Sequence, residues 1–445
     1  HGNRARAIPV QRPRTRPSRP EDNQQPDPER DMAAAEVWRS INALPEHEFE
    51  AAGSLDTYET TPQAHREDLH GIWREILKYY RQAMANAEDP LTDQDVQAAL
   101  RWWTISTCIF LGKPERGGKA GKQEVAKRFK KWRTNKPSLL TQWLEEKQNV
   151  STRGRSRAAQ QSEENRLRTE VTKKIHKGNI GSAVRRIESN GIADTGDEEV
   201  RRQLQAKHPP RKDTDHVPHP EPERYPGGAL LSEGDDPTRE EAVQDMAERL
   251  RRLPTFKAPG PMGLRYEHLS DLAKGAAGIP SDALYRQMAS RDALDVIEGL
   301  EQLQFDYIHC RLPKWFYRTS GSLRLIALAK PPDPSRPNAK PVRPIGIADA
   351  MRRVFHRKII AENTAAARQY FEPLQYCLSD SSASKLVNRT RMSFESNQAF
   401  CVMHLDVRNA YNTATRRAIV EAIAEIPELC HLQPLVATLL EEMPS

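Results

Sequence analysis

Apolar residues recur every three or four positions in three stretches of the chain, residues 63–84, 91–111 and 281–311. This spacing predicts amphipathic helices, because positions so spaced share one face of an α-helix. We expect Pro90 to close the first helix and Thr92 to cap the start of the second. The apolar stripe of the first helix consists of Leu69, Ile72, Trp73, Ile76 and Tyr80.

Two adjacent tryptophans, Trp102 and Trp103, lie in the second of these stretches. Aromatic rings can stack on bases, but a position on the apolar face of a helix favours a place in the core. We interpret both as core residues. The stretch that follows, residues 113–136, is basic and glycine-rich and is compatible with contacts to a phosphate backbone.

A different pattern occupies residues 324–359, where two short apolar runs flank a proline-rich turn. This pattern predicts a hairpin, with one strand ending at Lys330, a second strand from Val342 to Ile347, and a basic helix after it. Lys330 then lies on one arm and Arg343 on the other. An arginine at the end of a hairpin can hold a phosphate with two hydrogen bonds, and a nearby lysine adds a point charge.

The charge of the chain is concentrated in this segment. Residues 323–360 contain nine Lys or Arg against Asp333 and Asp349, so the segment carries 9 − 2 = +7, the same as the whole chain. A run of charge can be a solvated surface. Next to a candidate catalytic carboxylate, it instead suits a polyanionic substrate.

That carboxylate is Asp406, which ends the apolar run CVMHLDV of residues 401–407. We expect a short buried strand there, followed by a helix over residues 413–426. Phosphoryl transfer uses carboxylates at such junctions, because metal ions must hold the attacking and the leaving oxygen. The alternative is that Asp406 only caps the helix or lies in a solvated turn.

Four segments in this order resemble the reverse transcriptase of non-LTR retrotransposons. Residues 251–269, which contain KAPGPMG, resemble the entry motif of that family, and the hairpin resembles its paired fingers strands. Residues 376–392 lie where the pre-palm segment is expected, and LDVRNAYNTATRRAI resembles the first palm motif. The resemblance implies an α+β fold, the fingers and partial palm of a right-hand polymerase, preceded by a mainly helical N-terminal region with a disordered basic arm.

Roles for individual residues follow from the resemblance. It implies that Asp406 is the first catalytic aspartate and binds Mg²⁺ (or Mn²⁺) with the Val407 carbonyl. It implies that Lys330 and Arg343 bind the triphosphate of a deoxynucleoside triphosphate, and that Tyr411 packs under the sugar and excludes a ribose 2′-hydroxyl. The implied partners are an RNA template and a DNA primer. Taken alone, Tyr411 could be a core aromatic and Lys330 a surface charge.

The sequence departs from the family at three places. Met262 replaces the usual acid of the entry motif, which we expect to loosen a local turn, and Ser379, Ser381 and Ser382 stand in the pre-palm segment, where relatives tend to be glycine-rich. No aromatic-x-Asp-Asp motif follows Asp406. We therefore expect a truncated RNA-directed DNA polymerase that is inactive as this chain. A non-catalytic RNA-binding remnant and an intron maturase-like splicing protein remain as alternatives.

Composition divides the chain into five expected parts. They are a disordered Arg/Pro-rich arm (1–60), a helical N-terminal extension (61–193), a linker (194–236), the fingers (237–395) and the beginning of the palm (396–445). Five scattered cysteines predict neither a disulfide framework nor a zinc finger, and no apolar run is long enough to span a membrane. We expect an intracellular protein, with integration in the nucleus and synthesis in the cytoplasm; its oligomeric state is left open.

Overall fold

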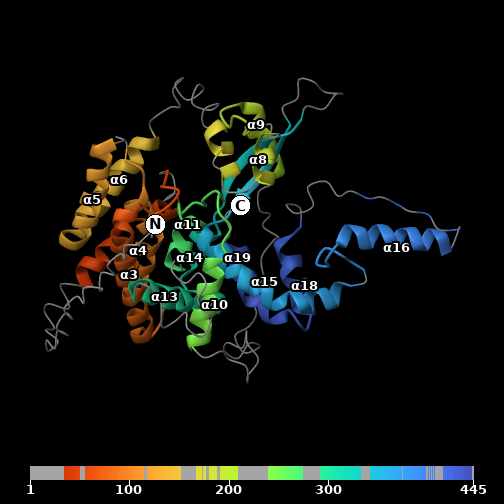
Figure 1. Cartoon of the computed structure of the whole chain (residues 1–445). Coiled ribbons are helices and arrows are strands. Elements are labelled where there is room, and N and C mark those ends of the chain that lie inside the picture. The colour runs from red at the N-terminus through yellow and green to blue at the C-terminus, as the bar shows by residue number, and fades with distance from the viewer. Residues whose placement is uncertain are drawn as a thin grey trace, which may run out of the picture.

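The structure is a computed structural model, mainly helical, with one two-stranded antiparallel sheet (Figure 1). It describes residues 35–50, 56–114, 118–151, 167–172, 174–176, 180–187, 191–208, 239–273, 291–331, 341–372, 374–396, 399, 401, 403, 405 and 414–442.

A helical body formed by the N-terminal third of the chain lies at one end of the molecule. The expected apolar stripe of its first long helix is buried, as are Trp102 and Trp103 in the second. The N-cap of the second helix is Asp93 and not Thr92, because the Asp93 carboxylate accepts hydrogen bonds from the N–H groups of Asp95 and Val96. The elements are η1 (Ser40–Ala43), α2 (His47–Glu50), η3 (Gln63–His65), α3 (Arg66–Asn86), α4 (Gln94–Leu111), α5 (Gly118–Thr134) and α6 (Lys136–Ser151).

The middle of the chain packs directly on this body. Helix α13 crosses α3 closely at Gly299, where an added Cβ atom would lie 2.5 Å from the Leu77 Cβ. One hydrophobic core therefore runs from α3 and α4 into the central helices and on to Phe355. The central elements are α10 (Arg239–Arg251), α11 (Tyr266–Ser270), η5 (Asp271–Ala273), α13 (Arg291–Ile308) and α14 (Lys314–Gly321).

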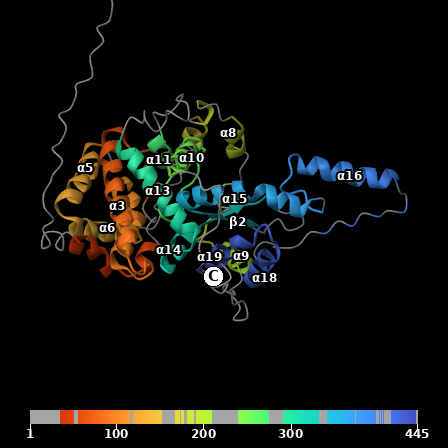
Figure 2. The same ribbon diagram turned by 90° about the horizontal axis from the view of Figure 1, so that it is seen from below.

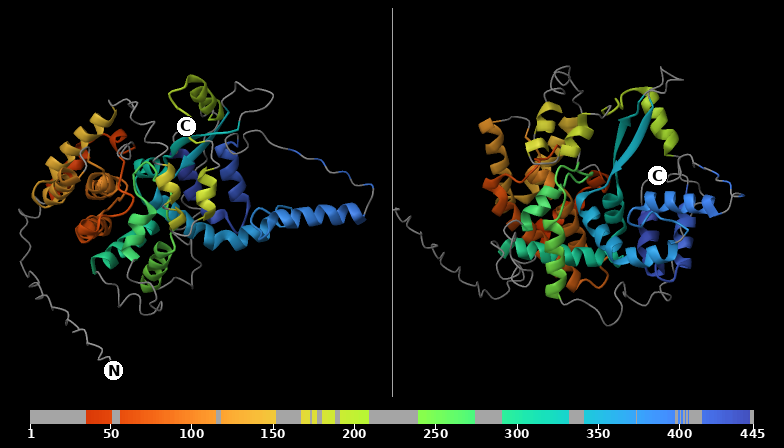
Figure 3. Two further views of the ribbon diagram at one scale, coloured as in Figure 1. Left: turned by 45° about the horizontal axis from the view of Figure 1, so that its top comes forward. Right: turned by 45° about the vertical axis from the view of Figure 1, so that its right-hand side comes forward.

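The predicted hairpin is present. Strands β1 (Arg324–Ala329) and β2 (Val342–Ile347) pair antiparallel, with Leu328 opposite Arg343. It stands out from the helical part, and the short helix α9 (Glu198–Lys207) packs against β2 (Figure 3). The short helix that precedes α9 is α8 (Ile180–Ile187). A short segment at Ile192 adds to the free edge of β1, since the Ala193 N–H donates to the Ala327 carbonyl at 2.8 Å.

Beyond the hairpin the chain forms a long basic helix and a projecting arm. Helix α15 (Ala350–Phe371) leaves the body and α16 (Ser382–Ser396) extends from it, on the side opposite α5 and α6 (Figure 2). The chain returns through α18 (Arg416–Glu425), η6 (Cys430–Leu432) and α19 (Gln433–Glu442), and α19 packs on α14. Helix α18 lies within the predicted helix 413–426 and buries Val420.

The buried strand expected before Asp406 is not formed by the residues described there. Met403 and Leu405 are 76% and 77% exposed, and neither they nor Cys401 belong to a strand. A strand needs a neighbouring strand for its backbone hydrogen bonds, and β1 and β2 pair only with each other among the described strands. Within the described residues, no helix is both long enough and apolar enough to cross a lipid bilayer.

Candidate nucleotide-binding hairpin

The register of the hairpin brings Lys330 and Arg343 to the same face. Leu328 lies directly opposite Arg343, and Lys330 is two residues further along β1. Side chains two residues apart in a strand point to the same side, and directly opposed residues share a side. The Lys330 N–H also donates to the Pro341 carbonyl at 2.9 Å, so pairing continues beyond the strand end. Lys330 and Arg343 are therefore diagonal neighbours across the two strands, with their Cβ atoms about 7 Å apart.

The opposite face of the hairpin is covered near its tip. Ala327 and Val342 are buried there against Val200 and Leu204 of α9. The Gln203 side-chain oxygen accepts from the Val342 N–H at 3.2 Å, and Lys207 donates to the Val342 carbonyl. Helix α9 thus covers one face of the hairpin and leaves the other face open to solvent. The open face carries Lys330 and Arg343.

Both cations are exposed and lack a carboxylate partner among the described residues. Their side chains make no hydrogen bond or ion pair within the part of the chain that the structure describes. A free ammonium and a free guanidinium on one open face attract a phosphate group, which offers several acceptor oxygens and negative charge. The hairpin has the geometry and the charge of a phosphate-binding element.

The loop of the entry motif packs on the junction between β2 and α15. An added Cβ atom at Gly260 would lie 2.5 Å from the backbone N and Cα of Asp349. Ordinary contacts to a Cβ atom lie between 3.4 and 4 Å, so only glycine fits this approach. The glycine of KAPGP therefore allows the loop to contact the point where the hairpin becomes a helix.

Asp349 begins helix α15 at this contact. Its carboxylate accepts from the Met351 N–H at 3.1 Å, and its other oxygen has no hydrogen-bond partner among the described residues. Burial raises the pKa of Asp349 from 3.8 to about 6, although the Met351 N–H and the Arg353 charge both act to lower it. Asp349 is thus a helix cap that carries its charge in the interior at neutral pH.

The other end of the entry motif is anchored to the N-terminal body. Gly263 has φ of +71°, and its carbonyl accepts from the Thr57 hydroxyl at 2.9 Å. The Met262 carbonyl accepts from the Cys108 thiol at 3.2 Å, and the Met262 side chain is buried in the core. The turn that we expected Met262 to loosen is closed, because the Gly263 N–H donates to the Gly260 carbonyl at 3.1 Å.

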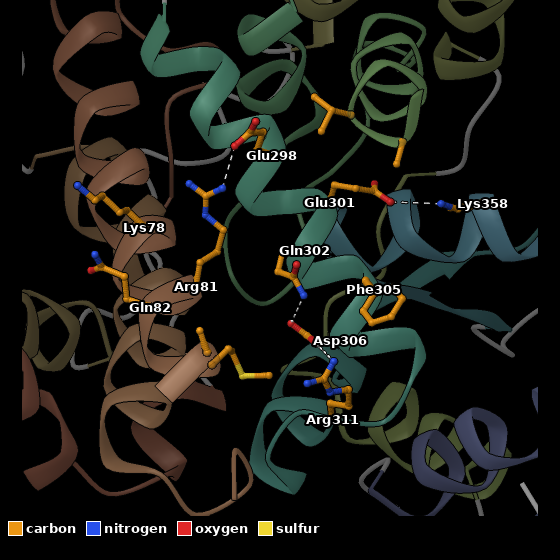
Figure 4. Close-up of a pocket in the computed structure, with 14 residues that line it drawn as sticks. Lys78, Arg81, Gln82, Glu298, Glu301, Gln302, Phe305, Asp306, Arg311 and Lys358 are labelled. Atoms are coloured by element: carbon orange, nitrogen blue, oxygen red, sulfur yellow. Dashed lines mark hydrogen bonds and ion pairs between the residues drawn. The ribbon is translucent and has the colours of Figure 1, made fainter. Parts of the chain in front are cut away.

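A cavity of about 790 Å³ lies between α3, α10, α13 and α15 (Figure 4). Its charged groups largely neutralise one another. Arg81 pairs with Glu298 at 2.8 Å, Lys358 with Glu301 at 3.2 Å, and Arg311 with Asp306 at 3.2 Å. Asp306 also accepts from the Tyr80 hydroxyl and the Gln302 amide. This cavity therefore offers a polyanion little net attraction.

The structure places only two of the predicted site residues. Asp406, Val407 and Tyr411 lie outside the described residues. Within the described part of the chain, no group of three or more His, Cys, Asp or Glu side chains is arranged to hold a metal ion. The structure therefore brings together Lys330 and Arg343, and gives no geometry for a metal at Asp406.

Sequence reasoning missed α9, which falls in the expected linker. The residues that hold it on the hairpin are Val200 and Leu204, which are spaced as on one helix face. The Asp197 side chain caps its start by accepting from the Glu199 N–H. An acidic cap followed by this apolar pair was the available signal, although two apolar residues are too few to establish a period.

Comparisons of the chain with protein-family models, with curated proteins and with solved structures found no significant match.

Proposed function

We propose that this chain contains the nucleotide-binding fingers of an RNA-directed DNA polymerase of the non-LTR retrotransposon type. One observation carries the proposal: the hairpin presents Lys330 and Arg343 side by side on its open face. The contact between the entry-motif loop and the start of α15 supports it, because two segments of the family pattern meet there. The order of the four sequence motifs supports it independently.

The two cations act on the charge of the incoming triphosphate. Arg343 holds phosphate oxygens through its planar fork of donors, and Lys330 adds a compact charge beside it. Negative charge shifts among the phosphate oxygens during transfer, and fixed cations stabilise that shift. Helix α9 keeps the hairpin in position by covering its opposite face.

The remaining roles rest on the sequence alone. Asp406 and the Val407 carbonyl would hold Mg²⁺ (or Mn²⁺), which when bound neutralises phosphate charge and activates the attacking 3′-hydroxyl. Tyr411 would lie under the sugar and exclude a 2′-hydroxyl. The substrates are a deoxynucleoside triphosphate, an RNA template and a DNA primer.

Photo-crosslinking of a deoxynucleoside triphosphate to the purified chain, with an RNA template and a DNA primer present, tests the role of the hairpin. Lys330→Ala and Arg343→Ala should each weaken nucleotide binding by about 1.5 kcal/mol, the lower end for a hydrogen bond to a charged group, because both side chains are exposed. The matched control is Arg324→Ala, a cation on the same face but about 20 Å along the strand from Lys330 and about 13 Å from the position opposite Arg343. An equal loss in all three variants would mean that only general charge is being measured.

A further inference from the structure

A second cavity, of about 470 Å³, opens at the base of the hairpin. It lies between the entry-motif loop, the start of β1 and helix α15. Four cations line it: Lys257 from the loop, and Arg352, Arg353 and Arg357 from α15. No carboxylate is among its lining residues in the part of the chain that the structure describes. We call these four residues the basic pocket.

Protein groups hold two of these cations in place and leave their charge largely uncompensated. Arg352 donates to the Gly321 carbonyl at 2.8 Å, and Arg353 donates to the Ala258 carbonyl at 3.1 Å. Arg353 lies near the buried Asp349, whose single charge can balance one of the four at most. Lys257 and Arg357 are exposed and form no ion pair with a described residue.

The opposite side of α15 carries a cation whose charge is compensated. Lys358 follows Arg357 in sequence, but it points to the larger cavity and pairs with Glu301 at 3.2 Å. Arg249 also reaches Glu301, at 3.4 Å. One side of α15 is therefore neutralised, whereas the side that faces the basic pocket has an excess of positive charge. Like charges so close repel one another, and a bound anion removes that repulsion.

The aromatic residue of the pocket indicates which part of a nucleic acid it accepts. Tyr266 is only 2% exposed, and the Arg353 and Arg357 guanidinium groups lie 4.4 and 5.3 Å from its ring centre. The ring is occupied by arginines and offers no free face on which a base could stack. Recognition therefore depends on the positive charge of the pocket, which attracts phosphates and does not distinguish one base from another.

We infer that the basic pocket binds the phosphodiester backbone of a nucleic-acid strand without reading its sequence. The inference rests on the proposed function for the identity of that strand, a template or primer held beside the hairpin. Cations contributed by a loop and by successive turns of a helix suit several phosphates along a strand better than one compact phosphate group.

Fluorescence anisotropy with a labelled 20-nucleotide RNA and the purified full chain tests the inference. The double variant Lys257→Gln/Arg357→Gln should bind the RNA about tenfold more weakly at low salt. The slope of log affinity against log salt should fall by about 0.7 for each cation removed. Restoring Arg357 as lysine, in Lys257→Gln/Arg357→Lys, should recover part of the affinity, because the charge returns.

The matched control is Arg391→Gln/Arg417→Gln, which removes the same charge from two exposed residues. Each of these pairs at 2.7 Å with a glutamate four residues on, in α16 and α18. The control should change RNA affinity less than twofold, because each of these arginines already has a carboxylate partner and lies outside the basic pocket. Equal weakening by the two double variants would overturn the inference, because only net charge would then matter.

Three further outcomes decide the ligand and separate this inference from the proposed function. Equal affinity for poly(U) and poly(A) supports backbone binding, whereas a strong base preference overturns it. Displacement of RNA by inorganic phosphate or a triphosphate at equal phosphate concentration would assign the pocket to a free phosphate group instead. If the pocket variant loses RNA binding while Lys330→Ala and Arg343→Ala leave nucleotide crosslinking unchanged, the inference stands and the proposed function fails.

Discussion

Replacing Gly260 with alanine should separate the entry-motif loop from the hairpin. The new Cβ atom would lie 2.5 Å from the N and Cα atoms of Asp349 and 2.7 Å from the carbonyl carbon of Ala348. All three are backbone atoms, so no side chain can rotate away. The loop or the start of α15 must move by about 1 Å to restore an ordinary contact, and overpacking of this kind costs about 1–3 kcal/mol.

A smaller opposing effect comes from the unfolded chain. Alanine has fewer backbone conformations than glycine, which favours the folded state by about 0.4–1 kcal/mol where the alanine fits. The net loss for Gly260→Ala should therefore be about 1–2 kcal/mol. Urea unfolding followed by circular dichroism measures it as a lower midpoint at unchanged slope.

The matched control is Gly299→Ala, where the new Cβ atom would also lie 2.5 Å from a neighbour, the Leu77 Cβ. This contact joins α3 to α13, away from the hairpin. Both variants should lose stability, but under conditions where both are folded only Gly260→Ala should also weaken nucleotide crosslinking and RNA binding. Wild-type stability in Gly260→Ala, or equal loss of binding in the two variants, would refute the role given to this contact.

Four other changes have definite expected results. The pKa of Asp349 is raised to about 6, so its contribution to stability is complete below about pH 3.8 and is lost as pH rises through 6. Asp349→Asn should remove this loss of about 3 kcal/mol, measured as the free energy of unfolding against pH, and an unchanged pH profile would contradict the prediction. Burial lowers the pKa of His356 to about 4, so its contribution to stability is present above pH 6.5 and is lost as pH falls toward 4. His356→Gln should reduce the fall in the free energy of unfolding at acid pH by at most about 3 kcal/mol, and an equally steep fall would contradict a buried neutral imidazole. In a protein that carries a complete palm, Asp406→Asn should nearly abolish primer extension and leave RNA binding intact, because a metal ligand is lost and no phosphate contact is; full activity would remove Asp406 from the site. In the same protein, Tyr411→Ala should lower the discrimination against ribonucleotides in paired kinetics, because a repulsive contact is lost, and unchanged sugar selectivity would return Tyr411 to the core aromatics.

The local pattern of apolar residues was sufficient to predict an element whose formation depends mainly on its own residues. The helix at 66–86 is predicted by its apolar stripe, and that stripe is buried. The hairpin is predicted by two apolar runs around a proline-rich turn, and its second strand spans Val342–Ile347 as expected. The sequence also indicated that Lys330 and Arg343 lie on neighbouring arms.

Local pattern failed where an element depends on a distant partner. Helix α9 has few apolar residues and forms by packing Val200 and Leu204 on the hairpin, and a short helix is stable only with such packing. The run before Asp406 is apolar like a strand, yet Met403 and Leu405 are exposed. An apolar run does not reveal whether a neighbouring strand is available to pair with it.

Pattern and charge along the chain were enough to locate the hairpin, the long helices and the cluster of positive charge around the hairpin. Tertiary contacts set which cations lack an ion pair within the described part of the chain. Arg357 and Lys358 are adjacent and alike in sequence, but Lys358 meets Glu301 on α13 whereas Arg357 faces the basic pocket. The pairing of a charge depends on residues far away along the chain, and periodicity reports only on near neighbours.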